Sequence, residues 1–166
     1  PLNKFGVKII SKKNKLPLKV YGTEYLRPIN YEEYKGSAQV KSCIMLAALN
    51  TPGITKIKCK PSRNHTELLF KHLKLNINIK KKNSYDVIKI KGGKQYKGFN
   101  YVIPGDISSA SFFIVLTLLS KNSKLVIKNI NVNESRTGII DILKKMNGKI
   151  IIKNKREYKG EQVADI

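Results

Sequence analysis

Residues 36–70, GSAQVKSCIMLAALNTPGITKIKCKPSRNHTELLF, contain the pattern that decides the fold. A nearly continuous apolar run over 38–49 predicts a buried helix, and the alternating run over 54–60 predicts a half-buried strand. The amphipathic run over 63–73 predicts a second helix. Core packing explains the apolar positions, but it does not explain the polar residues that gather where the two helices would begin.

The same arrangement recurs later in the chain, and a Ser-Arg pair opens the amphipathic helix of each copy, at 62–63 and 135–136. The helices of the second copy are predicted at 108–119 and 136–146, and further strands are predicted at 75–81, 85–92, 124–130 and 149–154. We expect the two apolar helices to be buried on most faces. Helix, strand, loop, helix, strand and strand therefore form one unit, and its recurrence predicts stacked copies in an α/β (α+β) fold.

The chain has 166 residues, a formal net charge of +22 and 41% hydrophobic residues. The hydrophobic content favours a folded core over disorder. Nearly all of the positive charge is lysine scattered over solvent-facing and turn positions, which favours a solvated surface. One alternative is a positive field that speeds the capture of small anionic substrates. A lysine-rich nucleic-acid-binding module remains an alternative, although stacking aromatics are sparse and no recognised nucleic-acid motif is present.

Two cysteines lie in apolar and alternating runs, which indicates a reducing compartment and no disulfide framework. No apolar run approaches the roughly 20 residues that span a bilayer, and no signal peptide is visible. We therefore expect a cytoplasmic protein without membrane contact. The chain lacks an initiator Met and ends as an apolar segment begins, which indicates a fragment of a longer protein.

The predicted helix starts have the chemistry of an anion site. Free N–H groups and the positive end of the helix dipole favour phosphate or carboxylate. Ser37 and Ser62 add hydroxyls, Arg63 adds a two-pronged guanidinium, and Gln39 can both donate and accept. Serines at the start of a helix can instead simply cap it. For Ser135, capping and a role in an anion site are equally good explanations.

Other polar residues have simpler interpretations. His65 and His72 would share a helix face, but without a third ligand they do not predict a metal site. His65 is instead expected to be a hydrogen-bonding group that faces the site. Asp106 is interpreted as a helix cap or a hinge residue. No P-loop, dinucleotide fingerprint or CxxC pair is present, so we expect no cofactor.

Four long motifs carry a resemblance to a known family. The stretches at 36–55, 62–70, 102–113 and 131–150 occur in this order and spacing in the EPSP synthase family, the 3-phosphoshikimate 1-carboxyvinyltransferases. The closing GEQVADI matches as well, so the resemblance covers the whole chain. It implies the enolpyruvyl transferase fold, in which two inside-out α/β barrel lobes are built from repeated β-α-β-α-β-β units. Residues 1–104 would belong to the N-terminal lobe and residues 105–166 to the C-terminal lobe.

The resemblance also implies an activity. The family transfers the enolpyruvyl group of phosphoenolpyruvate to the 5-hydroxyl of shikimate 3-phosphate and releases phosphate, by addition and elimination through a tetrahedral intermediate. This step belongs to the shikimate pathway, which leads to chorismate and the aromatic amino acids, and glyphosate inhibits it. The family uses no metal or organic cofactor and is expected to be monomeric at full length.

The resemblance assigns substrate-binding residues one by one: Ser37, Ala38 and Gln39 match the family's shikimate 3-phosphate triplet, with Gln39 also near phosphoenolpyruvate. Ser62 and Arg63 match the next substrate-facing element, and His65 occupies a nearby contact position. The family's acid/base carboxylate, catalytic lysines and phosphoenolpyruvate-clamping arginines lie outside these residues, so no catalytic residue is assigned and the fragment alone should not catalyse.

Two further alternatives stay open within this fold. One is the sister enzyme that transfers enolpyruvyl to UDP-N-acetylglucosamine. Its characteristic reactive-cysteine loop is absent here, and the SAQVKS and RTGI stretches favour the shikimate enzyme. The other alternative is a degenerate, inactive homologue.

Overall fold

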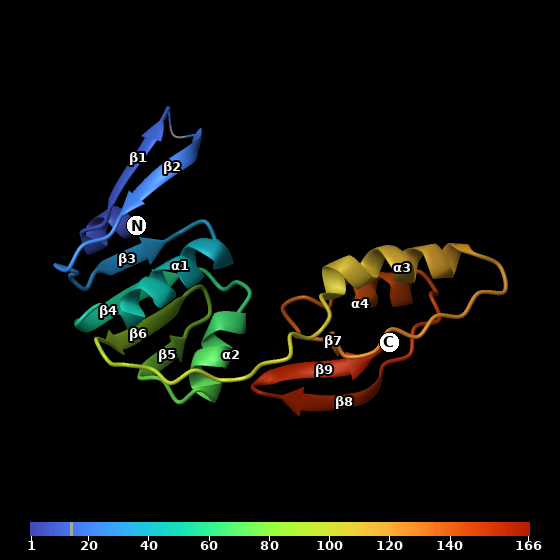
Figure 1. The fold of residues 1–166 in the computed structure, drawn as a ribbon. Helices are drawn as coiled ribbons and strands as arrows, with labels where there is room; N and C mark the ends of the chain where they lie inside the picture. The colour runs from blue at the N-terminus through green and yellow to red at the C-terminus, as the bar shows by residue number, and fades with distance from the viewer. Residues whose placement is uncertain (14) are drawn as a thin grey trace. The chain divides into compact units, whose positions relative to one another are not determined.

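The computed structural model of the chain describes residues 1–13 and 15–166 and divides them into two compact units (Figure 1). The first unit contains residues 1–62 and 73–97, and the second contains residues 63–72 and 98–166. No helix in the described residues is long and apolar enough to cross a membrane.

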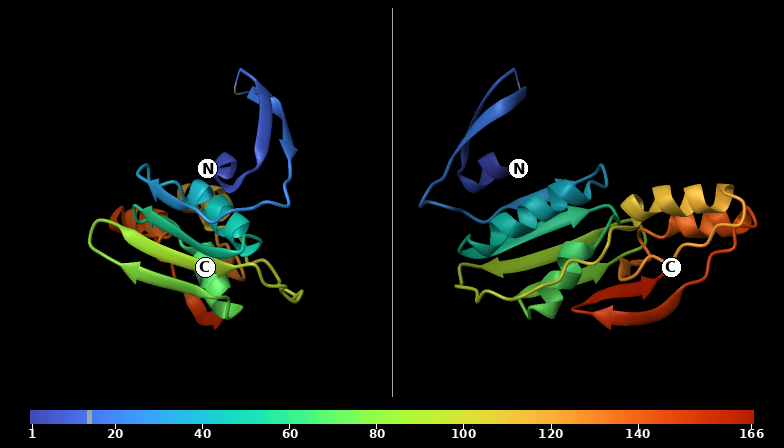
Figure 2. Two further views of the ribbon diagram at one scale, coloured as in Figure 1. Left: turned by 90° about the vertical axis from the view of Figure 1, so that its left-hand side faces the viewer. Right: turned by 45° about the vertical axis from the view of Figure 1, so that its right-hand side comes forward.

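The first unit opens with a 3-10 helix, η1, and a two-stranded hairpin, and continues into a four-stranded sheet of order β3-β4-β6-β5. Strands β3 and β4 are parallel, and the other neighbours are antiparallel. Helix α1 packs across the sheet against β4 and β6 (Figures 1 and 2). The elements are η1 (Leu2–Phe5), β1 (Lys8–Lys12), β2 (Lys15–Tyr21), β3 (Asn30–Glu33), α1 (Ala38–Leu49), β4 (Gly53–Cys59), β5 (Ile77–Lys81) and β6 (Asp86–Gly92).

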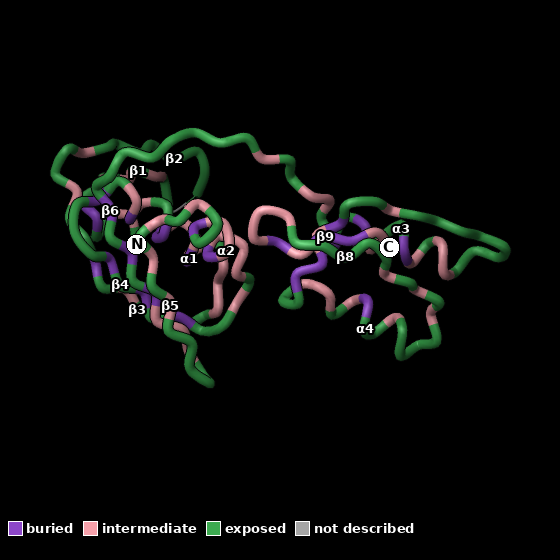
Figure 3. The backbone as a smooth tube through the Cα atoms, turned by 90° about the horizontal axis from the view of Figure 1, so that it is seen from below, coloured by how far each residue is buried: buried purple, intermediate pink, exposed green. Residues whose placement is uncertain are grey.

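Alternation builds the core of the first unit, because every second side chain of a strand faces the same side of the sheet. Ile57 of β4 lies opposite Ile88 of β6, and both are fully buried. Helix α1 adds Ile44 and Met45, which are fully buried as well. Figure 3 shows buried positions recurring along β4 and β6.

The second unit contains a three-stranded antiparallel sheet of order β7-β9-β8 together with three helices. Its elements are α2 (His65–His72), α3 (Ile107–Leu119), β7 (Ile130–Asn131), α4 (Gly138–Lys145), β8 (Lys153–Tyr158) and β9 (Glu161–Asp165). Helices α3 and α4 share one core with β7 and β9. The buried members of this core are Ile107, Ala110, Ile114, Ile130, Val132, Ile140 and Ala164.

The predicted repeat is confirmed by the sheet topology. In chain order the first copy is β3-α1-β4-α2-β5-β6, and the second copy continues as α3-β7-α4-β8-β9. In the second copy Gly105 takes the place of the first strand, because it forms a parallel bridge to Ile130 as β3 does to β4. The sheet orders β4-β6-β5 and β7-β9-β8 correspond strand for strand.

Two of the predicted strands are misplaced. The strand predicted at 124–130 is assigned only as Ile130–Asn131, although Ile127 exchanges both backbone hydrogen bonds with Ile166. Asn129, with φ of 56°, lies in the left-handed region and interrupts the ladder between these pairs. The strand predicted at 149–154 lies instead at Lys153–Tyr158, where it pairs with β9.

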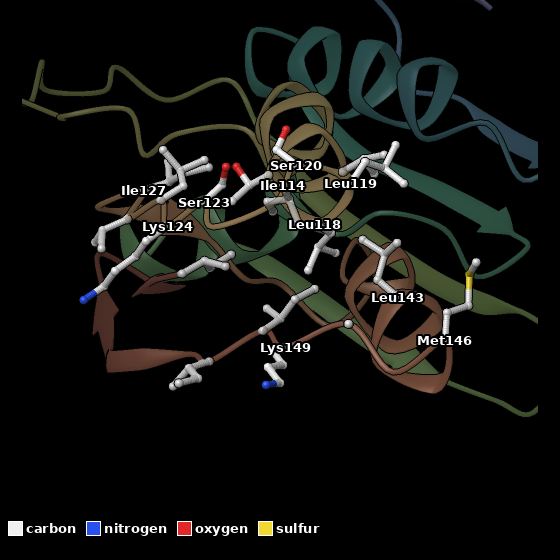
Figure 4. Close-up of a pocket in the computed structure, with 18 of the residues that line it drawn as sticks. Ile114, Leu118, Leu119, Ser120, Ser123, Lys124, Ile127, Leu143, Met146 and Lys149 are labelled. Carbon is white, nitrogen blue, oxygen red and sulfur yellow. The ribbon is translucent and has the colours of Figure 1, made fainter.

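The expectation that α3 is buried on most faces is wrong. Only Ile107, Ala110 and Ile114 are buried, because β7 and α4 cover one side of the helix. On the remaining side Phe112 and Leu119 are 77% and 80% exposed. A mostly apolar cavity of about 820 Å³ lies where α3 and α4 end (Figure 4), and none of the predicted site residues lines it.

Candidate functional site

The carboxyl ends of two parallel strands define one edge of the first unit's sheet. Strands β3 and β4 end in register at Glu33 and Cys59, and the connections that follow them lead to α1 and to residue 62. The connections lie close together, since a Cβ added at Gly36 would be 3.8 Å from the Cβ of Lys60. Ligands of open α/β sheets bind outside such strand ends. The fold thus brings the predicted residues 37–39 and Ser62 to the same edge.

The start of α1 is fixed by two local devices. The Glu33 carboxylate accepts hydrogen bonds from the N–H groups of Lys35 (2.9 Å) and Gly36 (2.8 Å), and Gly36 has a φ of +75° that favours glycine. Ser37 then caps the helix, since its Oγ accepts from the Val40 N–H at 3.3 Å. Sequence reasoning did not find Glu33. The only signal was an acid at the end of a strand just before the glycine.

Ser62 has a buried hydroxyl whose Oγ has no hydrogen-bond partner among the described residues. A buried polar group without a partner costs about 1–3 kcal/mol, which a bound ligand would relieve. Arg63 and His65 belong to the second unit, whereas Ser37, Ala38, Gln39 and Ser62 belong to the first. The structure therefore fixes the positions of Ser37, Ala38, Gln39 and Ser62 within the first unit, and those of Arg63 and His65 within the second.

The second copy shows what the arginine after the loop serine does there. Arg136 Nη2 donates to Asp106 Oδ1 at 2.8 Å and also bonds the Ser108 hydroxyl, so it reaches the start of α3. Asp106 caps α3 by accepting from the N–H groups of Ser108 and Ser109, which confirms its interpretation as a cap. Burial would raise the pKa of Asp106, but these N–H groups and Arg136 hold it below its usual value.

Replacing Asp106 with alanine should remove both the cap and the partner of Arg136. We expect a loss of about 1–2 kcal/mol in the free energy of unfolding, measured by urea titration. Asp106→Asn keeps a capping oxygen and should lose less. Equal losses for the two variants would show that capping is not the main contribution.

Capping by Ser135, one of its two interpretations, does not occur. Its N–H and its hydroxyl both donate to Asn133 Oδ1, at 2.9 and 2.7 Å, while Thr137 occupies the cap position without a side-chain bond. Asn133, two residues earlier, accepts both bonds in an Asx turn, so the Ser135 hydroxyl is engaged within the loop and not at the start of the helix. Ser135 therefore orders the loop that carries Arg136.

His65 is held by a carboxylate that sequence reasoning missed. Its Nδ1 lies 2.6 Å from Oε1 of Glu161, which is only 5% exposed. Glu161 Oε2 accepts from Asn131 at 3.0 Å and from Asn133 at 3.3 Å, and the Asn133 amide also donates to Asn64 Oδ1 at 2.8 Å. His65 and Glu161 are 96 positions apart, so no local pattern could reveal the pair.

A cavity of about 380 Å³ in the second unit is lined by this pair and by the pair at α3. His65, Glu161, Asp106 and Arg136 all contribute to its wall, together with Tyr101. Burial, followed by the charge of Glu161, raises the pKa of Tyr101, so its phenol stays a neutral hydrogen-bonding group at neutral pH. Within the described residues, no three His, Cys, Asp or Glu side chains gather as a metal site requires.

Glu161 should make the stability of the chain dependent on pH. Burial of its carboxyl would raise its pKa, but hydrogen bonds from His65, Asn131 and Asn133 and the charge of His65 hold the pKa below its usual value. Such a carboxylate contributes its full stabilisation of the folded state at pH values above its unfolded-state pKa of about 4.3. The stabilisation disappears as the pH falls through the lower folded-state pKa.

We therefore expect the urea midpoint to fall below about pH 5 in the unaltered chain and to fall less in Glu161→Gln. The lowered pKa values of Asp106 and Asp165 account for the pH dependence that remains in Glu161→Gln. The exposed Glu157, changed in the same way, is the matched control. Identical pH profiles for the unaltered chain and Glu161→Gln would contradict the assignment.

The comparisons with known proteins agree on one family. Residues 1–165 match the EPSP synthase (3-phosphoshikimate 1-carboxyvinyltransferase) family. The 3-phosphoshikimate 1-carboxyvinyltransferase of Thermoanaerobacter sp. (strain X514) is 46% identical over 170 aligned residues, which cover all of this chain and 38% of that protein. The protein of the same name from Ruthia magnifica subsp. Calyptogena magnifica is 41% identical, with the same coverage.

Solved structures show the same relationship. The 2.37 Å structure of an EPSP synthase from Acinetobacter baumannii matches with a TM-score of 0.78 and 34% sequence identity, over 99% of this chain and 37% of that one. The chain thus spans only 37–38% of the length of these relatives.

Proposed function

Because this chain belongs to the EPSP synthase family, we propose that the protein containing it transfers the enolpyruvyl group of phosphoenolpyruvate to the 5-hydroxyl of shikimate 3-phosphate. The 46% identity that extends over the whole chain is the observation that carries this proposal. In the reaction, the hydroxyl oxygen forms a bond to the enolpyruvyl carbon and the bond from that carbon to the phosphate oxygen breaks. The products are 5-enolpyruvylshikimate 3-phosphate and phosphate.

The chain contributes substrate recognition to this reaction. We assign Ser37, Ala38, Gln39, Ser62 and Arg63 to the binding of shikimate 3-phosphate, with His65 as a further contact. The capped start of α1 and the unpartnered buried hydroxyl of Ser62 support the assignment, since both suit an anion or a polar ligand. The catalytic residues are assigned to other parts of the full-length protein.

Three further properties belong to the same proposal. Residues 1–104 are assigned to the N-terminal lobe and residues 105–166 to the C-terminal lobe. The full-length protein is proposed to be a monomer. Its proposed location is the cytoplasm, which two free cysteines support.

The test is phosphate release by the full-length protein supplied with phosphoenolpyruvate and an acceptor. Release that requires both phosphoenolpyruvate and shikimate 3-phosphate is the expected result. Release with UDP-N-acetylglucosamine in place of shikimate 3-phosphate would assign the sister activity. A folded protein that releases no phosphate with either acceptor would contradict the proposal.

A further inference from the structure

The bond between His65 and Glu161 fixes where the imidazole carries its proton. An ionised carboxylate can only accept hydrogen bonds, so the 2.6 Å contact places a proton on Nδ1 of His65. In the neutral ring the other nitrogen, Nε2, then has a lone pair and acts as an acceptor. Carboxylates that bond a histidine in this way orient the ring as well as select its tautomer.

The carboxylate is itself held from the far side. Glu161 Oε2 receives N–H groups from Asn131 and Asn133, and the side chains of Glu161 and Asn133 are almost fully buried. Asn133 also bonds Asn64, the neighbour of His65 at the start of α2. Buried groups of β7, β9 and the loop after β7 thus fix two successive residues that directly follow Arg63.

His65 and Glu161 both line the cavity of the second unit, but the two side chains differ in exposure. The His65 side chain is 39% exposed and that of Glu161 only 6%, so the imidazole offers a ligand more accessible surface than the carboxylate does. An acceptor nitrogen at the wall of this cavity suits a hydroxyl donor. Shikimate 3-phosphate carries ring hydroxyls in addition to its anionic groups.

We propose that Glu161 is a positioning residue for substrate recognition, which acts by keeping Nε2 of His65 as the acceptor for a ring hydroxyl of shikimate 3-phosphate. This inference rests on the proposed function, because it takes shikimate 3-phosphate as the ligand. It assigns Glu161 a role through His65 and no contact with the reacting atoms.

The tautomer of His65 is the direct test. In Glu161→Gln the amide oxygen should stay where Asn131 and Asn133 donate, which places the amide NH₂ against Nδ1 and moves the imidazole proton to Nε2. The ¹⁵N spectra of the neutral imidazole in the full-length protein should therefore show Nδ1–H before the change and Nε2–H after it. His65→Gln identifies the signal, and the exposed Glu157→Gln should leave it unchanged. A proton on Nε2 in the unaltered protein under assay conditions, in either the other neutral tautomer or the doubly protonated ring, would overturn the proposal even if Glu161→Gln does not fold.

Kinetics provide the second measurement. We expect Glu161→Gln to raise KM for shikimate 3-phosphate by about tenfold and to change kcat by less than about twofold, since the altered contact is made equally in the ground state and the transition state. Glu157→Gln should change neither constant. An inverted tautomer with an unchanged KM would overturn the role in recognition. If the unaltered protein lacks the proposed activity, the tautomer still decides whether Glu161 sets the state of His65, so the two failures are distinguishable.

Discussion

Arg63→Ala in the full-length protein should raise KM for shikimate 3-phosphate by about 10- to 150-fold. The reason is the loss of a charge-assisted contact with an oxyanion, which is worth about 1.5–3 kcal/mol. The KM of Arg63→Lys should fall between the values of the unaltered protein and Arg63→Ala, because lysine keeps the charge but not the two-pronged geometry. Steady-state kinetics with phosphoenolpyruvate at saturation provide the measurement.

Two comparisons separate recognition from general electrostatics. Arg27→Ala removes the same charge from an exposed position of the first unit and should leave KM unchanged. Gln39→Ala should impair the use of both substrates, because Gln39 is assigned to both. Unchanged kinetics in both Arg63→Ala and Gln39→Ala would show that the binding site is elsewhere.

Gly92→Ala should cause a large loss of stability in the first unit, about 3 kcal/mol or more. An added Cβ would lie 1.8 Å from the carbonyl oxygen of Ala48 and 2.6 Å from that of Thr51. Both are backbone atoms, so no rotamer change can relieve the clash. The last residue of β6 and the end of α1 would have to move apart.

Gly98→Ala is the matched control, since a Cβ there meets nothing within 4 Å. Urea unfolding followed by circular dichroism should show a large fall in midpoint for Gly92→Ala and almost none for Gly98→Ala. Equal midpoints in the two variants would mean that α1 does not approach β6 as closely as the structure has it.

Local patterns predicted the elements that their own residues determine. Helix α1 was predicted at 38–49 and is found at Ala38–Leu49, since an apolar run between Ser37 and the turn at 51–53 leaves little freedom. Strand β6 was predicted at 85–92 and is found at Asp86–Gly92 for a similar reason. Strands β7 and β8 were misplaced because their bounds depend on pairing with β9 and on the left-handed residues Asn129 and Asn154.

The candidate site shows the same division. The serine cap of α1 and the aspartate cap of α3 could be interpreted from sequence, because capping acts over a few residues. The partners of His65 could not be found in this way, since β9 supplies Glu161 only after the whole second copy has folded. The exposed side of α3 was also missed, because an apolar run does not reveal which of its faces a neighbour covers.

The two copies of the unit differ in one residue at the start of their first helix. Asp106 caps α3 and is the partner of Arg136, whereas the corresponding cap of α1 is the uncharged Ser37, with no acid in the first turn. The second copy therefore includes a counter-ion for Arg136 at the start of its first helix. In the first copy the Glu33 carboxylate bonds N–H groups that precede the helix, and the first turn of α1 itself contains no acid. We expect phosphate-bearing solutes to raise the melting temperature mainly through the first copy, whose helix start would then act as a receptor while that of the second copy serves as scaffold.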